Sequence, residues 1–243
     1  MLYRPAPSNP YDLHMPITPD IPATELAIVE MTNAFRKEHK LSALTPNPTL
    51  AAAARAYART LAANTGLSHT LEGTTPATRA KEAGYAYCQI AENLAMASDS
   101  RGFTARDYAR RALTGWAGSP GHRKNLMLPY LTDIGVAVTR AGPDDPRYIA
   151  VQMFGRRQAT RYEFKVRNTG TKTVAYEFAG KTYDLEREQY MTHKVCLPGS
   201  ISIITDPKTK AAARYEARDG QVYTLNWGEN GVTVEVSSSP RSN

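Results

Sequence analysis

The residues best suited to chemistry are two histidines and a glutamate from separate segments of the chain. His69 follows a predicted helix in Gly-Leu-Ser-His-Thr, and His122 lies where a Ser-Pro-Gly turn opens a helix. Glu92 sits in the apolar run Ile-Ala-Glu-Asn-Leu-Ala, where a half-buried carboxylate needs an imidazolium or a metal as partner. Two neutral imidazoles and a carboxylate form a known zinc arrangement, and without metal they act as acid, base or ion pair.

The spacing of these three residues gives no short metal signature such as His-Glu-x-x-His. A shared site and unrelated structural roles therefore both stay open. Ser119, three residues before His122, suggests a serine hydrolase, but no Gly-x-Ser-x-Gly elbow accompanies it. Ser119-Pro120 is more typical of a helix cap followed by a first-turn proline.

Three other residues near these segments have simpler interpretations. Trp116 falls on the apolar face of its predicted helix, which favours a core position over a substrate platform. Asn93 and Asn125 are expected to form hydrogen bonds that hold loop backbone or orient the histidines.

The elements that must position these residues are mainly helical up to residue 128. Six prolines in the first 22 residues predict an extended tail over 1–23, and helical spacing then predicts a helix over 23–40 that Thr24 caps. Asn47-Pro48 starts a second helix that Gly66 stops, and Thr75-Pro76 starts a short third one. Further helices are predicted over 105–116 and 122–128.

The pattern after residue 130 is that of strands. Residues 134–138 and 148–154 predict a hairpin across a Gly-Pro-Asp-Asp-Pro turn. From residue 161, alternating apolar residues at 162–166, 174–178, 223–227 and 232–236 indicate an antiparallel sheet or small sandwich. Residues 238–243 are expected to fray.

Length and composition indicate a globular protein of two domains. The 243 residues suit one domain of about 130–150 residues plus a smaller one. Hydrophobic residues make up 42%, and no stretch approaches the roughly 20 apolar residues of a membrane span. The net charge of +7 permits an acidic partner, but the cations are spread along the chain, so we expect a basic surface and no nucleic-acid site.

Cys88 and Cys196 are the only cysteines. They lie too far apart for a metal knuckle or a redox Cys-x-x-Cys pair. One long-range disulfide, which would tie the two domains together, and two buried thiols are both open interpretations.

Eight segments of the first domain resemble bacterial members of the CAP superfamily (SCP-like domains), in the order in which the family has them. They are residues 28–44, 47–55, 68–69, 83–85, 91–95, 116–126, 134–136 and 151–155. The resemblance implies an α+β fold, with an α/β/α sandwich around an antiparallel sheet over 24–157. A small all-β domain is then expected over 158–237.

The resemblance also implies a cleft with two histidines and two acidic residues. His69 matches the first histidine, Glu92 the first glutamate and His122 the second histidine, whereas Ser119 stands where the second glutamate is expected. Asn93 and Ser119 are further expected cleft residues. Some members bind zinc or another divalent ion, so His69, His122 and Glu92 are the candidate metal ligands.

Three functions follow as hypotheses. The first is an exported, non-catalytic protein that binds a lipid, sterol, glycan or divalent metal in the His/Glu cleft. The second is a metal-assisted hydrolase with His69, Glu92 and His122 as candidate catalytic residues. The third is a module that recognises a cell-envelope component through the β domain. The opening residues lack the apolar core of a signal peptide, which leaves two alternatives: a cytoplasmic protein, or an exported one whose signal is already removed. The resemblance implies the second, because the family is usually secreted, so a secreted or periplasmic protein is expected.

Overall fold

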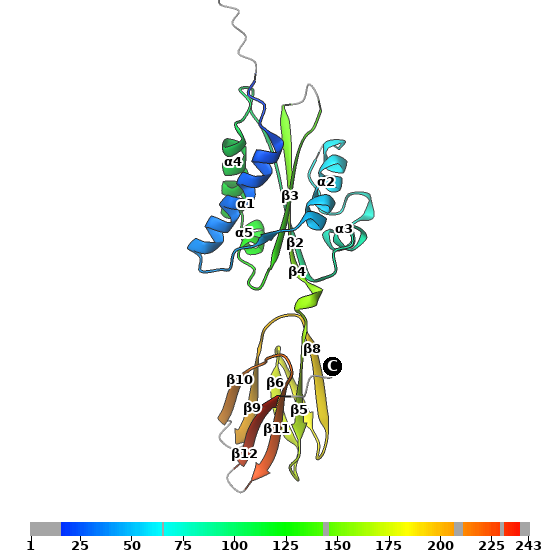
Figure 1. Ribbon diagram of the computed structural model, residues 1–243, viewed down its shortest axis with the longest axis vertical. Coiled ribbons are helices and arrows are strands. Elements are labelled where there is room, and N and C mark those ends of the chain that lie inside the picture. The colour runs from blue at the N-terminus through cyan, green and yellow to red at the C-terminus, as the bar shows by residue number, and fades with distance from the viewer. Residues whose placement is uncertain (1–15, 65, 143–145, 207–210, 229–230, 239–243) are drawn as a thin grey trace, which may run out of the picture. The chain divides into compact units, whose positions relative to one another are not determined.

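The computed structural model describes residues 16–64, 66–142, 146–206, 211–228 and 231–238. Two compact units make up the chain: the first comprises Met1–Tyr85 and Ile90–Gly155, and the second comprises Ala86–Gln89 and Arg156–Asn243. Figure 1 labels the helices and strands of both units. Most of the expected proline-rich tail, the centre of the expected 142–146 turn and residues 239–243 lie outside the described residues.

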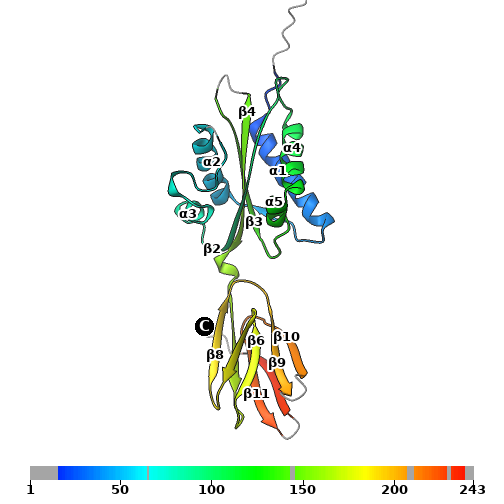
Figure 2. The same ribbon diagram turned by 180° about the vertical axis from the view of Figure 1, so that it is seen from behind.

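The first unit is a four-stranded sheet with helices on both faces. Its strand order is β1-β3-β4-β2, so β2 lies at an edge. Figures 1 and 2 show α1, α4 and α5 on one face of the sheet and α2 and α3 on the other. The expected α/β/α sandwich is confirmed. The elements are α1 (Ile21–Glu38), β1 (Thr45–Pro46), α2 (Pro48–Ala62), α3 (Pro76–Glu82), β2 (Tyr87–Ser98), α4 (Ala105–Gly118), α5 (Pro120–Leu126), β3 (Asp133–Arg140) and β4 (Arg147–Arg157), with a short 3-10 helix at Leu71–Gly73.

The strand pairing is mostly as the sequence indicates. β3 and β4 pair antiparallel from Asp133↔Gly155 to Arg140↔Tyr148, which confirms the hairpin. β1 pairs with β3 in parallel, a departure from a purely antiparallel sheet. β2 was not predicted as a strand.

The helix starts follow local capping chemistry. The Asn47 side chain accepts from the backbone N–H groups of Thr49 and Leu50, and Thr75 forms a capping box with Thr78, as their sequences predict. The predicted first helix is present as α1, but the prediction that Thr24 caps it was wrong. Asp20 caps this helix by accepting from the Ala23 N–H at 2.7 Å, and the Thr24 hydroxyl instead donates to the Asp20 carbonyl. The helix includes Pro22, because a first-turn proline lacks only an N–H that would be unpaired there.

The second unit is a β-sandwich of two four-stranded sheets, with orders β10-β9-β6-β7 and β12-β11-β5-β8. Both sheets supply residues to one core, for example Phe164 and Tyr223 from one sheet and Tyr176 and Ile203 from the other. The expected all-β domain is confirmed, but β5 pairs with β11 in parallel, so the sheets are not purely antiparallel. The strands are β5 (Tyr162–Asn168), β6 (Val174–Phe178), β7 (Lys181–Leu185), β8 (Tyr190–Val195), β9 (Ser200–Asp206), β10 (Ala211–Glu216), β11 (Gln221–Gly228) and β12 (Gly231–Ser238).

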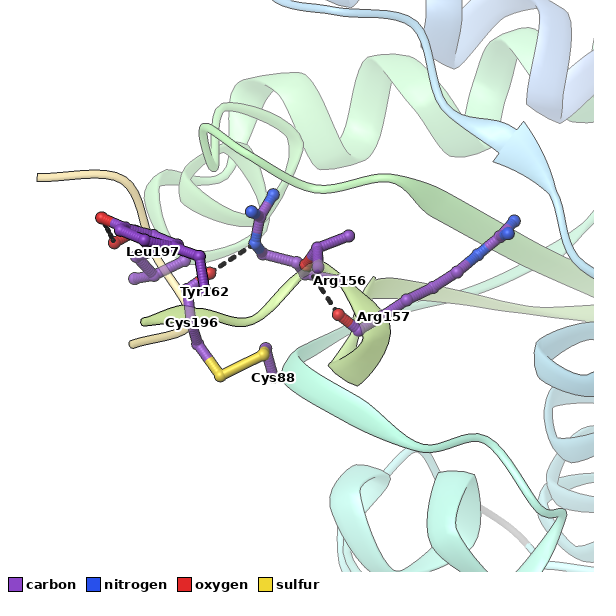
Figure 3. Close-up of a disulfide and its surroundings, with 7 residues drawn as sticks. Cys88, Arg156, Arg157, Tyr162, Cys196 and Leu197 are labelled. Carbon is purple, nitrogen blue, oxygen red and sulfur yellow. Dashed lines mark hydrogen bonds between the residues drawn. A yellow bond between two sulfur atoms is a disulfide. The ribbon is translucent and has the colours of Figure 1, made fainter. Parts of the chain in front are cut away.

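Cys88 and Cys196 form a disulfide, which decides between the two interpretations of the cysteines. Figure 3 shows the bond, together with Arg156 donating from Nε to the Cys196 carbonyl at 2.6 Å. Both cysteines belong to the second unit, because Ala86–Gln89 groups with it. The disulfide was expected to join the two domains. It instead joins two segments of the second unit, one of which contains the first residues of β2.

Candidate functional site

The candidate site lies around the edge strand β2, where segments from both helical layers meet. Glu92 and Asn93 are consecutive in β2, and their side chains point to opposite faces, as in any strand. Glu92 contacts His69, in the loop after α2, and Arg79 on α3, whereas Asn93 contacts the backbone of α5 at His122. Because neighbouring side chains of a strand face opposite sides of the sheet, β2 presents one of the two residues to each helical layer.

The Glu92 carboxylate is buried between two cationic or polar partners. Its Oε1 lies 2.8 Å from His69 Nδ1, and its Oε2 accepts from Arg79 at 2.6 Å. The Glu92 side chain is 1% exposed and that of His69 is 47% exposed. Because an ionised carboxylate only accepts hydrogen bonds, His69 Nδ1 carries a proton, and in the neutral form of the ring Nε2 is the unprotonated nitrogen.

Arg79 belongs to the site although the sequence analysis did not identify it. Besides Glu92, its guanidinium donates to the His69 carbonyl at 3.1 Å and lies 3.3 Å from the centroid of the Tyr57 ring. The Tyr57 hydroxyl in turn donates to the Ser68 carbonyl. Arg79 thus holds both the carboxylate and the loop that carries His69. No feature of the sequence distinguishes it from the other Lys and Arg residues.

Two asparagines fasten β2 to α5. Asn125 donates to the Glu92 carbonyl at 2.9 Å and to the Asn93 side-chain oxygen at 3.0 Å. Asn93 donates to the His122 carbonyl at 3.3 Å and to the Gln152 side chain at 3.2 Å. Both amides therefore hold backbone, the first of the two roles expected for them. Together they position the backbone of α5 at His122 against β2.

The His122 ring is half-buried, and no hydrogen bond to it exists among the described residues. Burial lowers the pKa of His122, and the neighbouring His69 lowers this pKa further. His122 is therefore a neutral imidazole at pH 7, able to accept a proton, a hydrogen bond or a metal.

Ser119 lies at the junction of α4 and α5, as expected of a cap, but its hydroxyl makes no capping hydrogen bond. The backbone carbonyl of Ser119 accepts from the Arg123 N–H at 2.7 Å instead. Within the described chain, Ser119 Oγ also makes no hydrogen bond to His122, so the pairing that would activate a serine nucleophile is not formed there.

An apolar pocket of about 410 Å³ opens beside Ser119 and His122. It lies between β2 and α4. Two of its lining residues are also exposed to solvent, Leu67 at 38% and Met96 at 40%. Trp116 borders it but is 1% exposed, with Nε1 donating to the Leu94 carbonyl at 2.8 Å, in agreement with its expected core position. The other lining residues are Leu94, Ala95, Ala97, Tyr108, Arg111, Ala112 and Gly115.

A three-ligand metal site does not fit the geometry around Glu92. Both Glu92 oxygens already have partners, His69 and Arg79. The described parts of the chain contain no group of three His, Cys, Asp or Glu side chains placed to share an ion. His69 Nε2 and the ring of His122 are the groups that remain suited to a divalent cation.

The family assignment follows from a sequence profile. The profile of the cysteine-rich secretory protein family, CAP, matches residues 29–154, just over half of the chain. The chain belongs to the CAP family. The match covers the first unit from the middle of α1 to β4, and most of the second unit lies outside it.

Several bacterial proteins are similar to this CAP unit. The uncharacterized protein YkwD of Bacillus subtilis is 29% identical over 123 residues, which is 50% of this chain and 45% of YkwD. This chain thus spans less than half the length of that relative. An outer surface protein of Borrelia burgdorferi (27% identity, TM-score 0.49) aligns over 56% of this chain and 93% of its own. An extracellular SCP-domain protein of Bacillus anthracis (27% identity, TM-score 0.46) aligns over 56% and 41%.

The helices were also compared with the requirements for a membrane span. None of the helices in the described segments combines the length and the apolar character needed to cross a bilayer.

Proposed function

We propose that this CAP protein is an exported, non-catalytic binding protein whose CAP unit takes a small, largely apolar ligand. The ligand occupies the pocket between β2 and α4 and contacts the polar site at Ser119 and His122. Of the expected ligand classes, lipid and sterol suit this lining better than glycan.

The observation that carries this proposal is the pocket itself. Its volume of about 410 Å³ falls within the range of about 300–1,000 Å³ typical of small-molecule sites. Its lining is mainly apolar and includes the polar residues Ser119 and His122. Such a pocket with a few convergent polar groups is the usual form of a ligand site.

The state of Glu92 supports binding over catalysis. A general base must have an oxygen within reach of the substrate proton. Both Glu92 oxygens are occupied by His69 and Arg79, and the side chain is 1% exposed. Glu92 is therefore best understood as the residue that orients His69.

Export is supported by the disulfide between Cys88 and Cys196. Disulfides persist in oxidising compartments and are rare in the cytosol. The proposal of a secreted or periplasmic location rests on this bond and on the family, whose members are usually secreted.

The test is to fill the pocket. The Cβ position of Gly115 has no atom within 4 Å, so Gly115→Phe should place its ring in the pocket without backbone strain. We expect wild-type protein to bind the neutral apolar fluorophore 1-aminoanthracene and Gly115→Phe to lose at least about 90% of this binding. Gly118→Phe is the matched control, because Gly118 also lies in α4 with open space around it but does not line the pocket. Equal binding by both variants would refute the proposal.

A second candidate is a divalent ion bound by the two histidines. It is favoured by one observation: His69 Nδ1 is held by a carboxylate, the arrangement that commonly orients a metal-binding imidazole. The ion would supply a Lewis acid beside the pocket that His122 lines. Calorimetric titration of zinc should then give binding that His69→Ala and His122→Ala each abolish, and unchanged binding in both variants would exclude this site.

A further inference from the structure

The strand β8 of the second unit is anchored in the core of the β-sandwich by a histidine. β8 lies at an edge of its sheet and, among the described strands, pairs with β5 alone. Of its six residues, His193 is the buried one, at 8% exposure, and the other five are exposed or only partly buried. The attachment of this edge strand to the interior therefore depends on a side chain that can take up a proton.

The His193 ring lies among aromatic side chains from three strands. They are, with the distance between ring centroids, Phe164 on β5 (4.8 Å), Tyr183 on β7 (4.9 Å), Phe178 on β6 (5.2 Å) and Tyr176 on β6 (5.7 Å). The Nε2 atom of His193 shares a hydrogen bond of 2.6 Å with the Tyr176 hydroxyl. Through this one ring, β8 contacts both sheets of the sandwich.

The titratable groups that face His193 are neutral. They are the phenols of Tyr176 and Tyr183. Burial raises the pKa of Tyr176, and the neighbouring Tyr183 raises it further, so Tyr176 does not ionise near neutral pH. Burial also lowers the pKa of His193. The packed form of the ring is the neutral imidazole.

The charged side chains of the neighbouring strands do not compensate a proton on His193. The acids Glu163, Glu177 and Asp184 alternate with the residues that contact the ring, so they face the outside of their sheets. Lys181, on the inward side of β7, is an exposed cation. Within the described parts of the chain, no carboxylate lies within ion-pair distance of His193. An imidazolium here would be a buried charge without a counter-ion.

We infer that the β-sandwich contains an acid-operated release of its edge strand, in which protonation of His193 frees β8 from the core and opens the edge of β5. This inference is independent of the ligand proposed for the CAP unit. Above the ordinary histidine pKa of about 6.5, the ring is neutral in both states and β8 stays packed. Below it, an exposed His193 gains a proton that the buried ring excludes, so the open state becomes more populated as the pH falls.

The opened edge would present unpaired N–H and C=O groups of β5, which can pair with a further strand. The released β8 would remain attached at its end, because Cys196 directly follows it and is bonded to Cys88. Acid would thus expose a docking edge without separating the strand from the protein.

Hydrogen exchange of backbone amides in the full-length protein tests this release. Protection factors are measured at about pH 7.5 and about pH 5.0, where an open-state pKa of about 6.5 limits the effect to about thirtyfold. We expect the protection of β8 to fall at least about fivefold more than that of β12. β12 is the matched control, because it forms the other edge of the same sheet and contains no histidine. Equal falls in the two strands, or no fall in β8, would overturn the inference.

Two variants separate proton uptake from the hydrogen bond. His193→Gln keeps a polar side chain that takes up no proton in this range, so the additional fall in β8 should disappear. Tyr176→Phe removes the hydrogen-bond partner but leaves the imidazole, so the fall should remain. A fall that persists in His193→Gln, or that is absent in Tyr176→Phe, would contradict release by charge. The comparison of β8 with β12 in wild type decides the matter even where a variant does not fold.

Discussion

The Glu92 carboxylate depends on Arg79 for its charge balance. Replacement of Arg79 by Gln leaves a carboxylate of 1% exposure with His69 as its remaining partner. Removing one member of a buried ion pair typically costs about 3–5 kcal/mol of unfolding free energy, so we expect a loss of about 3 kcal/mol in urea denaturation. Arg110→Gln, which breaks an exposed pair with Asp107, should cost less than about 0.5 kcal/mol. Similar losses in the two variants would show that the buried pair contributes little.

The pKa of His122 is predicted to depend on His69. Burial and His69 both lower the pKa of His122. His69→Ala removes the second cause but not the first, so the pKa of His122 should rise toward, but not reach, its ordinary value. NMR titration of the imidazole signals measures this shift. A His122 pKa that does not respond to His69→Ala would mean that the rings do not interact.

Sequence reasoning located the histidines and Glu92 but did not identify Arg79. The three chemically distinctive residues stand out in polar turns or an apolar run. An arginine on a short helix has no such mark, because its role arises from a contact with Glu92 that only the fold creates. The sequence predicted that Asn93 and Asn125 would each form hydrogen bonds. It did not predict that they would bond to each other, because that contact too is created only by the fold.

Helix α2 and strand β3 approach each other closely at Gly135. A Cβ at this position would lie 2.3 Å from the Leu50 carbonyl carbon and 2.4 Å from the Ala51 nitrogen, so backbone would have to move. We expect Gly135→Ala to lower the unfolding free energy by at least about 2 kcal/mol, measured by urea denaturation. Gly118→Ala has open space and should change stability by less than about 1 kcal/mol. A neutral Gly135→Ala would contradict the close packing of α2 on β3.

Elements with local start signals were the predictable ones. Asn47-Pro48 and Thr75-Pro76 define helix starts because the capping bonds form within a few residues. β2 was missed because helices cover the sheet on both faces, so the strand shows no simple alternation and includes buried Glu92 and Asn93. The parallel pairing of β5 with β11 could not be predicted, since strands about 60 residues apart leave no local trace of their register.

At the scale of the whole molecule, the disulfide is the covalent constraint on the second unit. It joins residues 108 positions apart, and removal of such a bond typically costs about 2–5 kcal/mol. We expect Cys88→Ser with Cys196→Ser to lower the melting temperature of the second unit in calorimetry. Addition of a reductant should produce the same shift in wild type and none in the double variant. A reductant effect on the double variant would show that the shift has another source.

The assignment of function to the pocket between β2 and α4 is tested most directly by NMR of methyl-labelled methionine. Of the seven methionines, Met96 lines this pocket and is 40% exposed, whereas Met191 lies in the second unit with 38% exposure. Titration with 1-aminoanthracene should shift the Met96 methyl signal, assigned through Met96→Leu, and leave that of Met191 in place. A shift of Met191 with no change at Met96 would place the ligand in the β-sandwich and contradict the account.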